Sequence, residues 1–379
     1  MTDLLVVPAE TPAQLRRFVT VPWSIYRDDP KWVPPIITEQ LKKLDPAHNS
    51  FWNKATRALW TAERGGRVVG SIAAIHDRTR EAQGASAQGT FGFFECENDP
   101  ATARALLDRA SAWLRERGMT EMIGPYNPST ADDIGILVDG FDTRPALVEG
   151  HHPRYYGPLL EGLGMEKLRD AYAWLVEPPA GAKNVREFLP ERLFRGSDRA
   201  RANPDVRVRE FDPSRWDSEV GLAHELFNTS LATVPEFVPI GEAEFRALAA
   251  SFRMFIDKRM VLFLEVAGRP VAYALALPDI NEAIQRVNGR LGPIGLAKLW
   301  WHSRHLHRAS FKILVVHPEF RQRGLEALLI EKVAQALLDG GFKEADLSLT
   351  GEENMKINMI LAGLGMHVYR TYRVYKRTL

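Results

Sequence analysis

Hydrophobic and polar positions change period several times along the second half of the chain. Residues 206–211 alternate in the manner of a strand, whereas residues 219–231 and 242–252 have helical spacing. The pattern then predicts a strand pair over 261–277, a strand over 311–316, a helix over 325–337, a strand over 345–350, a helix over 355–364 and a strand over 366–376. Strict alternation of strand and helix is missing, and so is a Gly-x-Gly-x-x-Gly after the first strand, which favours a mixed α/β (α+β) sheet over a dinucleotide-binding fold.

Two segments of the first half recur in the second at nearly the same offset. Residues 63–70 resemble 265–272, where both read as β-hairpins with a Gly-containing turn. Residues 160–165 resemble 361–366, where both read as a helix ending at a glycine before a strand. The repeat predicts a duplicated domain, with halves at 1–178 and 205–379 and a linker with one amphipathic helix at 179–204. Chance similarity of short glycine-containing strings is the alternative.

Composition narrows the functional class only a little. The net charge of +1 gives no global attraction to nucleic acid or to an anionic membrane. Cys96 is the only cysteine, which excludes an intramolecular disulfide and a Cys-rich metal site. The N-terminus lacks the features of a signal peptide, and no apolar run reaches the length of a membrane span. We therefore expect a cytoplasmic protein without a transmembrane segment, a bound metal or a nucleic-acid partner.

The most informative segment lies between residues 313 and 325. An apolar run ending at Val316 is followed by Pro318, a basic turn at Arg321 to Gly324, and a strongly periodic helix. The first turn of a helix offers unpaired amides and the positive end of its dipole, and glycine lets a ligand approach the backbone. This order predicts a site for a phosphate-containing ligand. Alternatively, Gly324 only allows a tight turn and the arginines are solvated.

With the elements around it, this segment resembles the GNAT superfamily of acetyl-CoA-dependent N-acyltransferases over about residues 205–379. The motif stands here as Val316-His317-Pro318 followed by residues 321–326. The resemblance implies acetyl-CoA or a longer acyl-CoA as co-substrate, with its pantetheine beside Val315 and Val316. It assigns the CoA pyrophosphate to Arg321, Gln322, Arg323, Gly324, Leu325 and Glu326. An asparagine eleven residues before a glycine, Asn354 before Gly365, assigns Asn354 to the pantetheine arm.

Two positions depart from the family pattern. Glu326 occupies a place usually held by a small residue, where its carboxylate would oppose pyrophosphate unless it faces water, as first-turn glutamates normally do. Leu361 stands where a tyrosine often protonates the leaving thiolate. Tyr372, or alternatively Tyr369 or Tyr375, would have to supply that proton, although cross-strand packing is the simpler interpretation of all three.

The remaining catalytic roles have weaker candidates. The resemblance implies direct attack of a neutral amine on the thioester, with the Val316 amide as donor to the oxyanion. Glu265, Asp279 and Asp346 are candidate bases, and each is also explained as a structural carboxylate. Catalysis by positioning alone is a further alternative.

The first half resembles the same fold less closely. Glu95, Glu97 and Asp99 stand where the second half has its arginines, so we expect no conventional CoA site there. The segments 22–35 and 124–130 are similar to a bacterial group of tandem GNAT proteins. If the halves pack face to face, the acceptor cleft lies between them.

An insertion at residues 289–308 combines apolar residues, two tryptophans, histidines and arginines. It could cover an apolar pocket or touch a membrane interface. A helix packed between the two halves is the alternative, and a metal site is disfavoured because no acidic partner is near.

The leading hypothesis is an acyl-CoA-dependent N-acyltransferase with two tandem GNAT-like domains, the first degenerate, acting on a small-molecule amine. One alternative is a non-catalytic acyl-CoA-binding or scaffold protein. Another is an aminoacyl-tRNA-dependent transferase on the same fold. Homodimer formation is left open.

Overall fold

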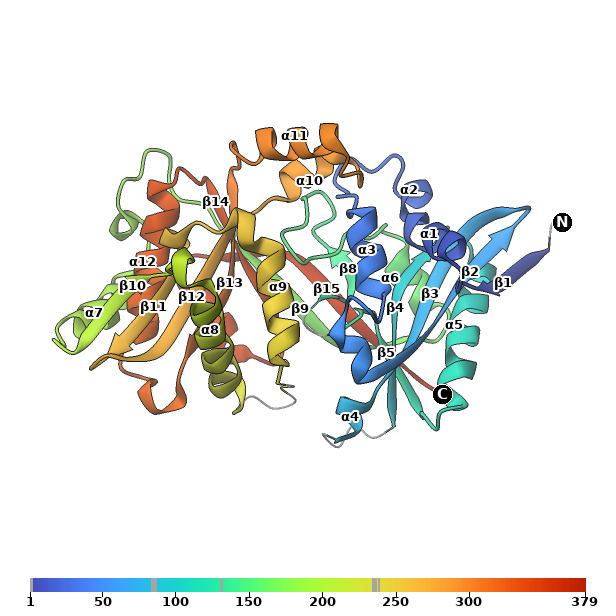
Figure 1. Ribbon diagram of the computed structural model, residues 1–379, viewed down its shortest axis with the longest axis horizontal. Helices are drawn as coiled ribbons and strands as arrows, with labels where there is room; N and C mark the ends of the chain where they lie inside the picture. The colour runs from blue at the N-terminus through green and yellow to red at the C-terminus, as the bar shows by residue number, and fades with distance from the viewer. Residues whose placement is uncertain (1–2, 83–86, 130–131, 234–236, 238) are drawn as a thin grey trace.

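The computed structural model of the chain describes residues 3–82, 87–129, 132–233, 237 and 239–379 (Figure 1). Two halves lie side by side and share one continuous mixed sheet. The strand order is β1-β2-β3-β4-β5-β15-β9-β14-β13-β12-β11-β10, with β8 also pairing with β15. Within the described residues, no helix is long and apolar enough to cross a membrane.

The two halves share the order of their main strands and helices, and the first half adds the short strands β6 to β8. The strands of the first half are β1 (Leu4–Pro8), β2 (Ala55–Arg64), β3 (Arg67–Asp77), β4 (Gln88–Cys96), β5 (Glu121–Gly124), β6 (Tyr126–Asn127), β7 (Asp133–Ile134), β8 (Ile136–Asp139) and β9 (Glu166–Val176). The strands of the second half are β10 (Val206–Glu210), β11 (Val261–Val266), β12 (Arg269–Pro278), β13 (Arg308–Val316), β14 (Glu344–Gly351) and β15 (His367–Thr378). The segments predicted as strands in the second half are confirmed as strands.

The helices cover both faces of the sheet. The first half contains α1 (Pro12–Thr20), α2 (Pro22–Ile25), α3 (Ile37–Leu44), α4 (Arg78–Ala82), α5 (Pro100–Arg115) and α6 (Tyr156–Glu161). The segment predicted to be the linker contains α7 (Glu191–Arg201). The second half contains α8 (Trp216–Leu231), α9 (Glu242–Phe252), α10 (Asn281–Val287), α11 (Pro293–His302), α12 (Leu325–Asp339) and α13 (Met355–Gly363). Helix α8 begins earlier than predicted, immediately after a single 3-10 turn at Pro213–Arg215.

Equivalent helices form the two main cores. In the first half, α5 buries Leu106, Leu107 and Leu114 in a cluster with residues of β2 to β4. In the second half, α12 does the same with Leu328 and Val333 against β11 to β13. The apolar face read from the sequence of α12 is therefore the buried face, as expected from its helical period.

The repeated turns have matching conformations. The β2–β3 turn has positive φ at Gly65 and Gly66, and the β11–β12 turn has positive φ at Ala267 and Gly268. Two consecutive positive φ angles are the requirement of a two-residue hairpin turn that matches the strand twist. The local likeness seen in the sequence is thus a likeness of backbone structure.

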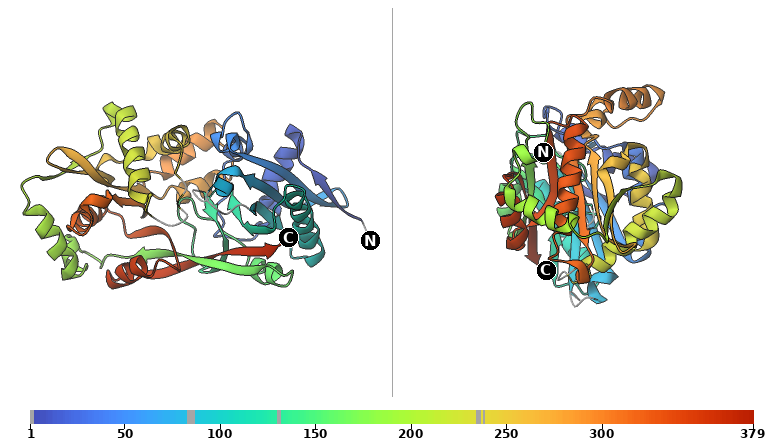
Figure 2. Two further views of the ribbon diagram at one scale, coloured as in Figure 1. Left: turned by 90° about the horizontal axis from the view of Figure 1, so that it is seen from below. Right: turned by 90° about the vertical axis from the view of Figure 1, so that its left-hand side faces the viewer.

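The last strands of the two halves are exchanged. The strand β9 of the first half pairs with β14 of the second, and β15 of the second half pairs with β5 of the first. β9 and β15 also pair with each other along most of their length and span both halves (Figure 2). The domain limits predicted from the repeat therefore follow the chain, whereas the sheet crosses them.

Candidate functional site between the halves

The strands β13 and β14 diverge to form a V-shaped opening in the sheet. They pair in parallel only from Arg308 to Phe311, and beyond that point β14 remains paired with β9 alone while β13 stays with β12. The amide of His317 donates to the carbonyl oxygen of Val271 on β12. Because strand amides alternate between two sides, the amides of Val316 and Leu314 face the opening. The amide of Val316, the predicted oxyanion donor, therefore faces the opening, and its catalytic role stays a prediction.

An irregularity in the β12–β13 register lies beside Lys312. The pairing shifts between Leu275 and Ala276 of β12, which leaves Lys312 without an opposite residue. Such a bulge places two consecutive side chains on one face of a strand. Lys312 and Ile313 consequently both line the cavity under α8 and α9.

The basic turn at residues 321–324 lies between the end of β13, at the opening, and the start of α12. Val316 ends β13, a 3-10 turn covers Pro318–Phe320, and Gly324 precedes α12 with φ +81°. The side chain of Arg321 donates to the carbonyl oxygen of Val316 at 3.2 Å and to the carbonyl oxygen of Ser230. Arg323 donates to the carbonyl oxygen of Glu319 at 3.0 Å. Both guanidinium groups therefore brace the turn, while both residues stay exposed.

Gly324 has a second structural reason to be glycine. A Cβ at this position would lie 2.3 Å from the carbonyl oxygen of Gly196 on α7. The linker helix therefore packs directly on the start of α12. Substitution of Gly324 would disturb this packing as well as any phosphate site, so it cannot isolate a cofactor role.

Two further residues of the predicted cofactor site have structural surroundings of their own. Glu326 is half-buried, and its Oε2 is shielded from solvent, in contrast to the expected water-facing glutamate. Asn354 is exposed and its side chain caps α13 by accepting from the amide of Ile357 at 3.4 Å. Its contact with pantetheine stays a prediction.

The three tyrosines of β15 are buried and their hydroxyl groups are engaged. Tyr372 donates to the carbonyl oxygen of Gly150 at 2.9 Å, Tyr369 donates to Asp346 at 2.9 Å, and Tyr375 donates to Glu161 at 3.0 Å. Burial raises the pKa of all three phenols. Leu361 lies in a separate hydrophobic cluster with residues of α7. The structure thus gives these tyrosines the cross-strand packing role considered above, and the acid role of Tyr372 stays a prediction.

Glu149 lies on the loop between β8 and α6 and was not predicted from the sequence. Its carboxylate is 1% exposed, and Oε1 has no hydrogen-bond partner among the described residues. That side chain is 4.0 Å from the ammonium of Lys312, and its Oε2 accepts from the amide of Ala146 at 3.3 Å. Burial and the nearby negative charge of Asp346 raise the pKa of Glu149 to about 8. A carboxyl group with this pKa can exchange a proton near neutral pH.

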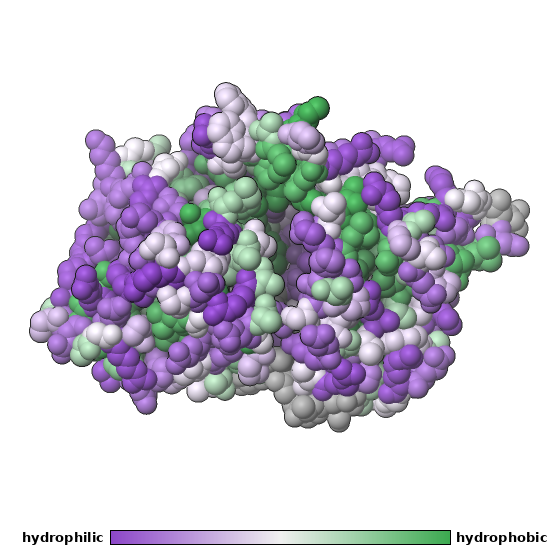
Figure 3. Space-filling model, in the orientation of Figure 1, coloured by the Kyte–Doolittle hydropathy of each residue, from purple (hydrophilic) through white to green (hydrophobic). Residues whose placement is uncertain are grey.

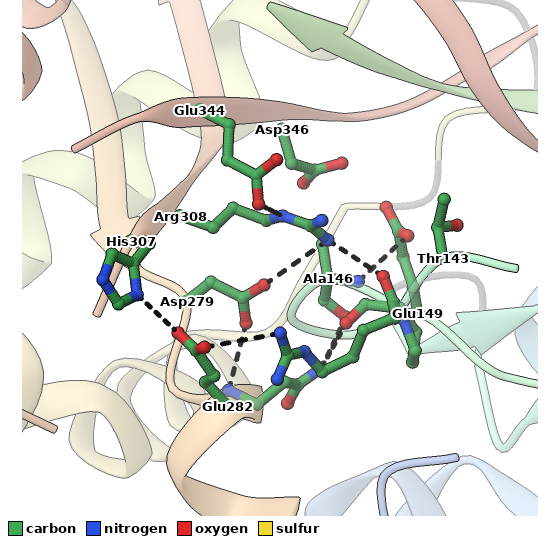
Figure 4. Close-up of polar contacts among 12 residues, drawn as sticks. Thr143, Ala146, Glu149, Asp279, Glu282, His307, Arg308, Glu344 and Asp346 are labelled. Atoms are coloured by element: carbon green, nitrogen blue, oxygen red, sulfur yellow. Dashed lines mark hydrogen bonds and ion pairs between the residues drawn. The ribbon is translucent and has the colours of Figure 1, made fainter. Parts of the chain in front are cut away.

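The two halves meet around this loop. Figure 4 shows Ala146 and Glu149 facing Arg308 and Asp346, on strands of the second half, and Asp279, which directly follows β12. Lys312 donates to Asp346 at 3.2 Å, and although burial lowers its pKa, the charges of Asp346 and Glu149 raise it overall. The Glu149 side chain therefore comes from the first half to a cluster otherwise built by the second.

Arg370 of β15 holds the same loop in place. Its fully buried guanidinium donates to the carbonyl oxygens of Thr143 and Gly150 at 2.5 and 3.0 Å and to the hydroxyl of Tyr372 at 2.7 Å. Buried charge-assisted hydrogen bonds of this kind fix geometry strongly. The exchanged strand thus positions the loop that carries Glu149.

The three carboxylates suggested as bases by the sequence are placed differently. Glu265 of β11 pairs with Arg209 of the adjacent antiparallel strand β10 at 2.8 Å. Asp346 is fully buried and bonded to Lys312 and Tyr369. Burial raises the pKa of Asp279 to about 6, and its carboxylate accepts from the amide of Asn281. Glu149 alone among these four carboxylates combines an unbonded oxygen with a place on a cavity wall.

Two cavities meet at Glu149. One, of about 330 Å³, is almost wholly apolar and lies between α8, α9 and the strands β11 to β13. The other, of about 640 Å³, is more polar and lies between α3, β4, the Glu149 loop and α9. Residues lining both are Asp132, Leu147, Val148, Glu149, Ile240, Leu248 and Phe252. The space-filling view shows the hollow between the halves, flanked by hydrophobic residues (Figure 3).

The equivalent opening in the first half is filled by its own chain. β4 and β5 pair only from Gln88 to Thr90 before diverging. A Cβ on Gly92 would lie 1.8 Å from the carbonyl oxygen of Tyr126, and the amide of Phe93 donates to Asn127 at 2.6 Å. The strand β6 therefore lies where the opening would be. Thr130, the last residue of the predicted family segment here, lies outside the described residues.

The N-terminus of α5, beside that opening, is already bonded to side chains of the first half. Asp99 caps α5 by accepting from the amides of Ala101 and Thr102. Arg64 pairs with both Glu97 and Asp99. A helix N-terminus that already holds a carboxylate has little capacity for a phosphate. Among the described residues, no group of three or more histidine, cysteine, aspartate or glutamate side chains is arranged for a metal ion.

Known proteins similar to this chain share its whole length. It is 35% identical over 384 aligned positions to a bacterial ceramide synthase of Caulobacter vibrioides, covering 100% of this chain and 98% of the relative. It is 29% identical to the protein YghO of Escherichia coli, covering 96% of this chain and 92% of that relative. No family model matches the chain.

Solved structures show the same fold at much lower identity. A tandem GNAT protein from the clavulanic acid biosynthesis pathway aligns with a TM-score of 0.59 and 13% identity, covering 99% of this chain and 98% of the other. A GCN5-related N-acetyltransferase from Sphaerobacter thermophilus aligns with a TM-score of 0.52 and 13% identity, covering 99% and 95%. The predicted architecture of two tandem GNAT-like units is confirmed by these matches.

Proposed function

This chain belongs to the family of the bacterial ceramide synthase and has the tandem GNAT fold, and from that premise we propose that it is an N-acyltransferase for lipid substrates. A ceramide is the amide of a fatty acid and a long-chain amino alcohol. The proposed reaction joins a fatty acyl group, carried as an acyl-CoA thioester, to the amine of such an alcohol. Acyl transfer in general is what both the relative and the fold support.

The observation that carries the proposal is the position of Glu149 between the two cavities. The cavity of about 330 Å³ has apolar walls that include Phe227, Phe245 and Phe263, and it is the proposed place for the apolar chain of the acyl group. Its polar end carries Glu149 and Lys312, where a reacting head group would lie. The larger, more polar cavity offers space for the second substrate.

The chemistry follows from these positions. The carboxylate of Glu149 accepts a proton from the attacking amine, the new C–N bond forms, and the C–S bond of the thioester breaks. The amides of Val316 and Leu314 face the opening where the carbonyl oxygen gains charge, and a backbone donor at such a place stabilises the oxyanion. The proton taken up by Glu149 can then neutralise the leaving thiolate. In this scheme one group serves as base and acid, so no tyrosine is required.

The turn at 321–326 supports acyl-CoA as the donor. Its glycine has the left-handed conformation, and the adjoining edge of β13 presents free-facing amides to the opening. A pantetheine arm can pair with such an edge as an added strand. Val315, Val316 and residues 321–326 therefore keep their proposed places along the cofactor.

The direct test uses purified protein with palmitoyl-CoA and sphinganine. Amide product is measured by mass spectrometry and released thiol by a colorimetric reagent. Glu149→Gln keeps the shape of the side chain, and we expect turnover to fall by about 10²–10⁴-fold, the usual contribution of a general base. Glu265→Gln is the matched control and should retain wild-type turnover. Wild-type turnover by Glu149→Gln, with an unchanged melting temperature, would contradict the assignment of the base.

A non-catalytic acyl-CoA-binding protein is the second candidate, favoured by the buried and bonded hydroxyl of Tyr372. It predicts stoichiometric palmitoyl-CoA binding by calorimetry without thiol release in the presence of an amine panel. Copurified tRNA would instead support the aminoacyl-tRNA-dependent alternative, and light scattering would decide whether the chain forms a homodimer.

A further inference from the structure

The connection between β12 and β13 is much longer than its counterpart in the first half. There, β3 and β4 are joined by residues 78–87, of which the described part contains the short helix α4. In the second half the connection contains α10 and α11, and α11 projects beyond the body of the molecule (Figures 1 and 2). The helix pair α10 and α11 is therefore a feature of the second half of the chain.

The outer surface of α11 is apolar and exposed. Ile294 is 75% exposed, Leu296 51%, Trp300 56% and Trp301 60%. At the helical period these four residues occupy adjacent positions over about half of the circumference, away from the buried Leu299. An exposed cluster of large apolar side chains on a soluble surface usually marks an interaction site.

The charged side chains within the segment that contains α11 have one sign, although Glu282 of the adjoining α10 lies 3.5 Å from His307. Residues 289–308 contain no aspartate or glutamate. Arg290, Lys298 and Arg304 are exposed within this segment, and the guanidinium of Arg304 lies 3.6 Å from the ring centroid of Trp300. Tryptophan combined with basic residues is the composition of helices that lie in the headgroup region of anionic membranes. The charge pattern therefore selects a negatively charged lipid surface.

The chain that leads into α11 is hydrogen-bonded to the first half. The indole of Trp23 donates to Asn288 at 2.8 Å, and the amide of Ile37 donates to the carbonyl oxygen of Gly289 at 3.0 Å. The side chain of Gln285 donates to the carbonyl oxygens of Pro30 and Trp32. The first half thus fixes the direction in which α11 faces. The packed-helix alternative holds for α10 and for the inner side of α11, and the outer side stays free.

Apolar contacts connect α11 to the apolar cavity. Leu299 packs in a cluster with Phe255, and Phe255 also belongs to the cluster of Leu277. Leu277 lines the cavity of about 330 Å³. A surface that received α11 would therefore lie next to the apolar wall of the candidate site.

We propose that the outer face of α11, formed by Ile294, Leu296, Trp300 and Trp301 and flanked by Lys298 and Arg304, docks the protein on the surface of an anionic phospholipid bilayer. The attachment is peripheral, with the helix lying along the headgroups. Docking itself is independent of the reaction; the added benefit, delivery of lipid substrates to the adjacent cavity, rests on the proposed function.

The test is flotation of the full-length protein with vesicles, without substrates. Vesicles of phosphatidylcholine with phosphatidylglycerol are compared with phosphatidylcholine alone. We expect binding to the anionic vesicles that weakens with salt, and a loss of at least about tenfold in Trp300→Gln/Trp301→Gln and in Lys298→Glu/Arg304→Glu. Met355→Gln/Met359→Gln on the exposed face of α13 is the matched control and should bind like the wild type.

Turnover of a water-soluble short-chain acyl-CoA with a soluble amine separates docking from catalysis. The α11 variants should retain it, whereas Glu149→Gln should lose it and still bind vesicles. Absence of vesicle binding by the wild type, or equal binding by all variants, would overturn the proposal. It would also be overturned if the tryptophan variants changed the oligomeric state and left vesicle binding intact.

Discussion

The two halves contain the same V-shaped divergence of two parallel strands, yet only one divergence is open. In the first half, β6 fills it and Asp99 and Arg64 neutralise the adjoining helix start. In the second half, the amides of β13 face the opening and a basic turn precedes α12. The comparison teaches that the fold alone does not create the site. A few residues at the opening and at the helix start determine it.

The closed half is nevertheless part of the site. Its loop carries Glu149 to the cluster of Lys312 and Asp346, and its residues Trp23 and Ile37 hold the insertion that bears α11. The second half contains the opening between β13 and β14, and the first half supplies the carboxyl group of Glu149 and the contacts that hold the insertion. Duplication thus allowed the two copies to divide these tasks.

The largest expected effect comes from disturbing the closed opening. Gly92→Ala places a methyl group 1.8 Å from the carbonyl oxygen of Tyr126, so backbone must move. We expect a loss of about 3 kcal/mol in the free energy of unfolding, as for a strongly overpacked position. Chemical denaturation measures it. Gly118→Ala, with φ +78° and open space around it, should cost only about 1 kcal/mol; equal costs would show that β6 is not a tight plug.

The next effect is on the pH dependence of turnover. Because the pKa of Glu149 is raised to about 8, the carboxylate form needed for a base is lost as pH falls below 8. We expect kcat/KM to rise about tenfold per pH unit from pH 6 and to level off above pH 8. Glu149→Gln should abolish this step.

Glu95, a buried carboxyl group of the first half, provides the control for the pH dependence of turnover. Burial raises the pKa of Glu95 to about 7, and it accepts from the hydroxyl of Tyr156 at 2.7 Å. Glu95→Gln should leave the pH step in place. A step that disappears with Glu95→Gln and persists with Glu149→Gln would move the base to the first half.

A charge reversal in the open turn should have a smaller effect. Arg323→Glu places a negative charge beside the proposed pyrophosphate, and we expect the dissociation constant for CoA to rise about tenfold, equal to about 1.4 kcal/mol. Calorimetry measures it. Arg67→Glu is the control, because it reverses an exposed positive charge at the start of β3 in the first half, away from the basic turn. Unchanged affinity of Arg323→Glu would favour a purely structural turn.

The smallest effect concerns the capped helix start of the first half. Hydrogen bonds from Thr102 and Arg64 hold the pKa of Asp99 at about 2. Because the pKa of Asp99 is lower in the folded than in the unfolded chain, its carboxylate stabilises the fold at pH values above the unfolded pKa of about 4. This stabilisation is lost as the pH falls towards 2. Asp99→Ala should therefore cost about 1 kcal/mol at pH 7 and much less at pH 2.5. A cost independent of pH would assign the effect to packing.

The sequence predicted local structure well and distant pairing poorly. The periodic face of α12 and the hairpin at Ala267 and Gly268 are local properties, so their residues predict them directly. Pairing of β15 with β5 joins strands that are far apart in the sequence, and no local pattern encodes that choice.

The candidate site divides in the same way. Gly324 was found because its conformation is required by its neighbours in the chain, and the structure adds the distant contact with Gly196. Glu149 lies in a short loop without periodicity, and its raised pKa arises from burial and from Asp346 on another strand. Only the folded arrangement brings those groups together.

The exchange of β9 and β15 has a consequence for the independence of the two halves. A cut in the linker would leave each fragment missing a strand of its own sheet and holding one that belongs to the other. Neither fragment could cover its exposed sheet edge alone. Coexpressed fragments could reassemble by pairing β9 with β14 and β15 with β5. Each half therefore depends on the other for a strand of its sheet, so deletion of either half would expose the sheet of the half that remains.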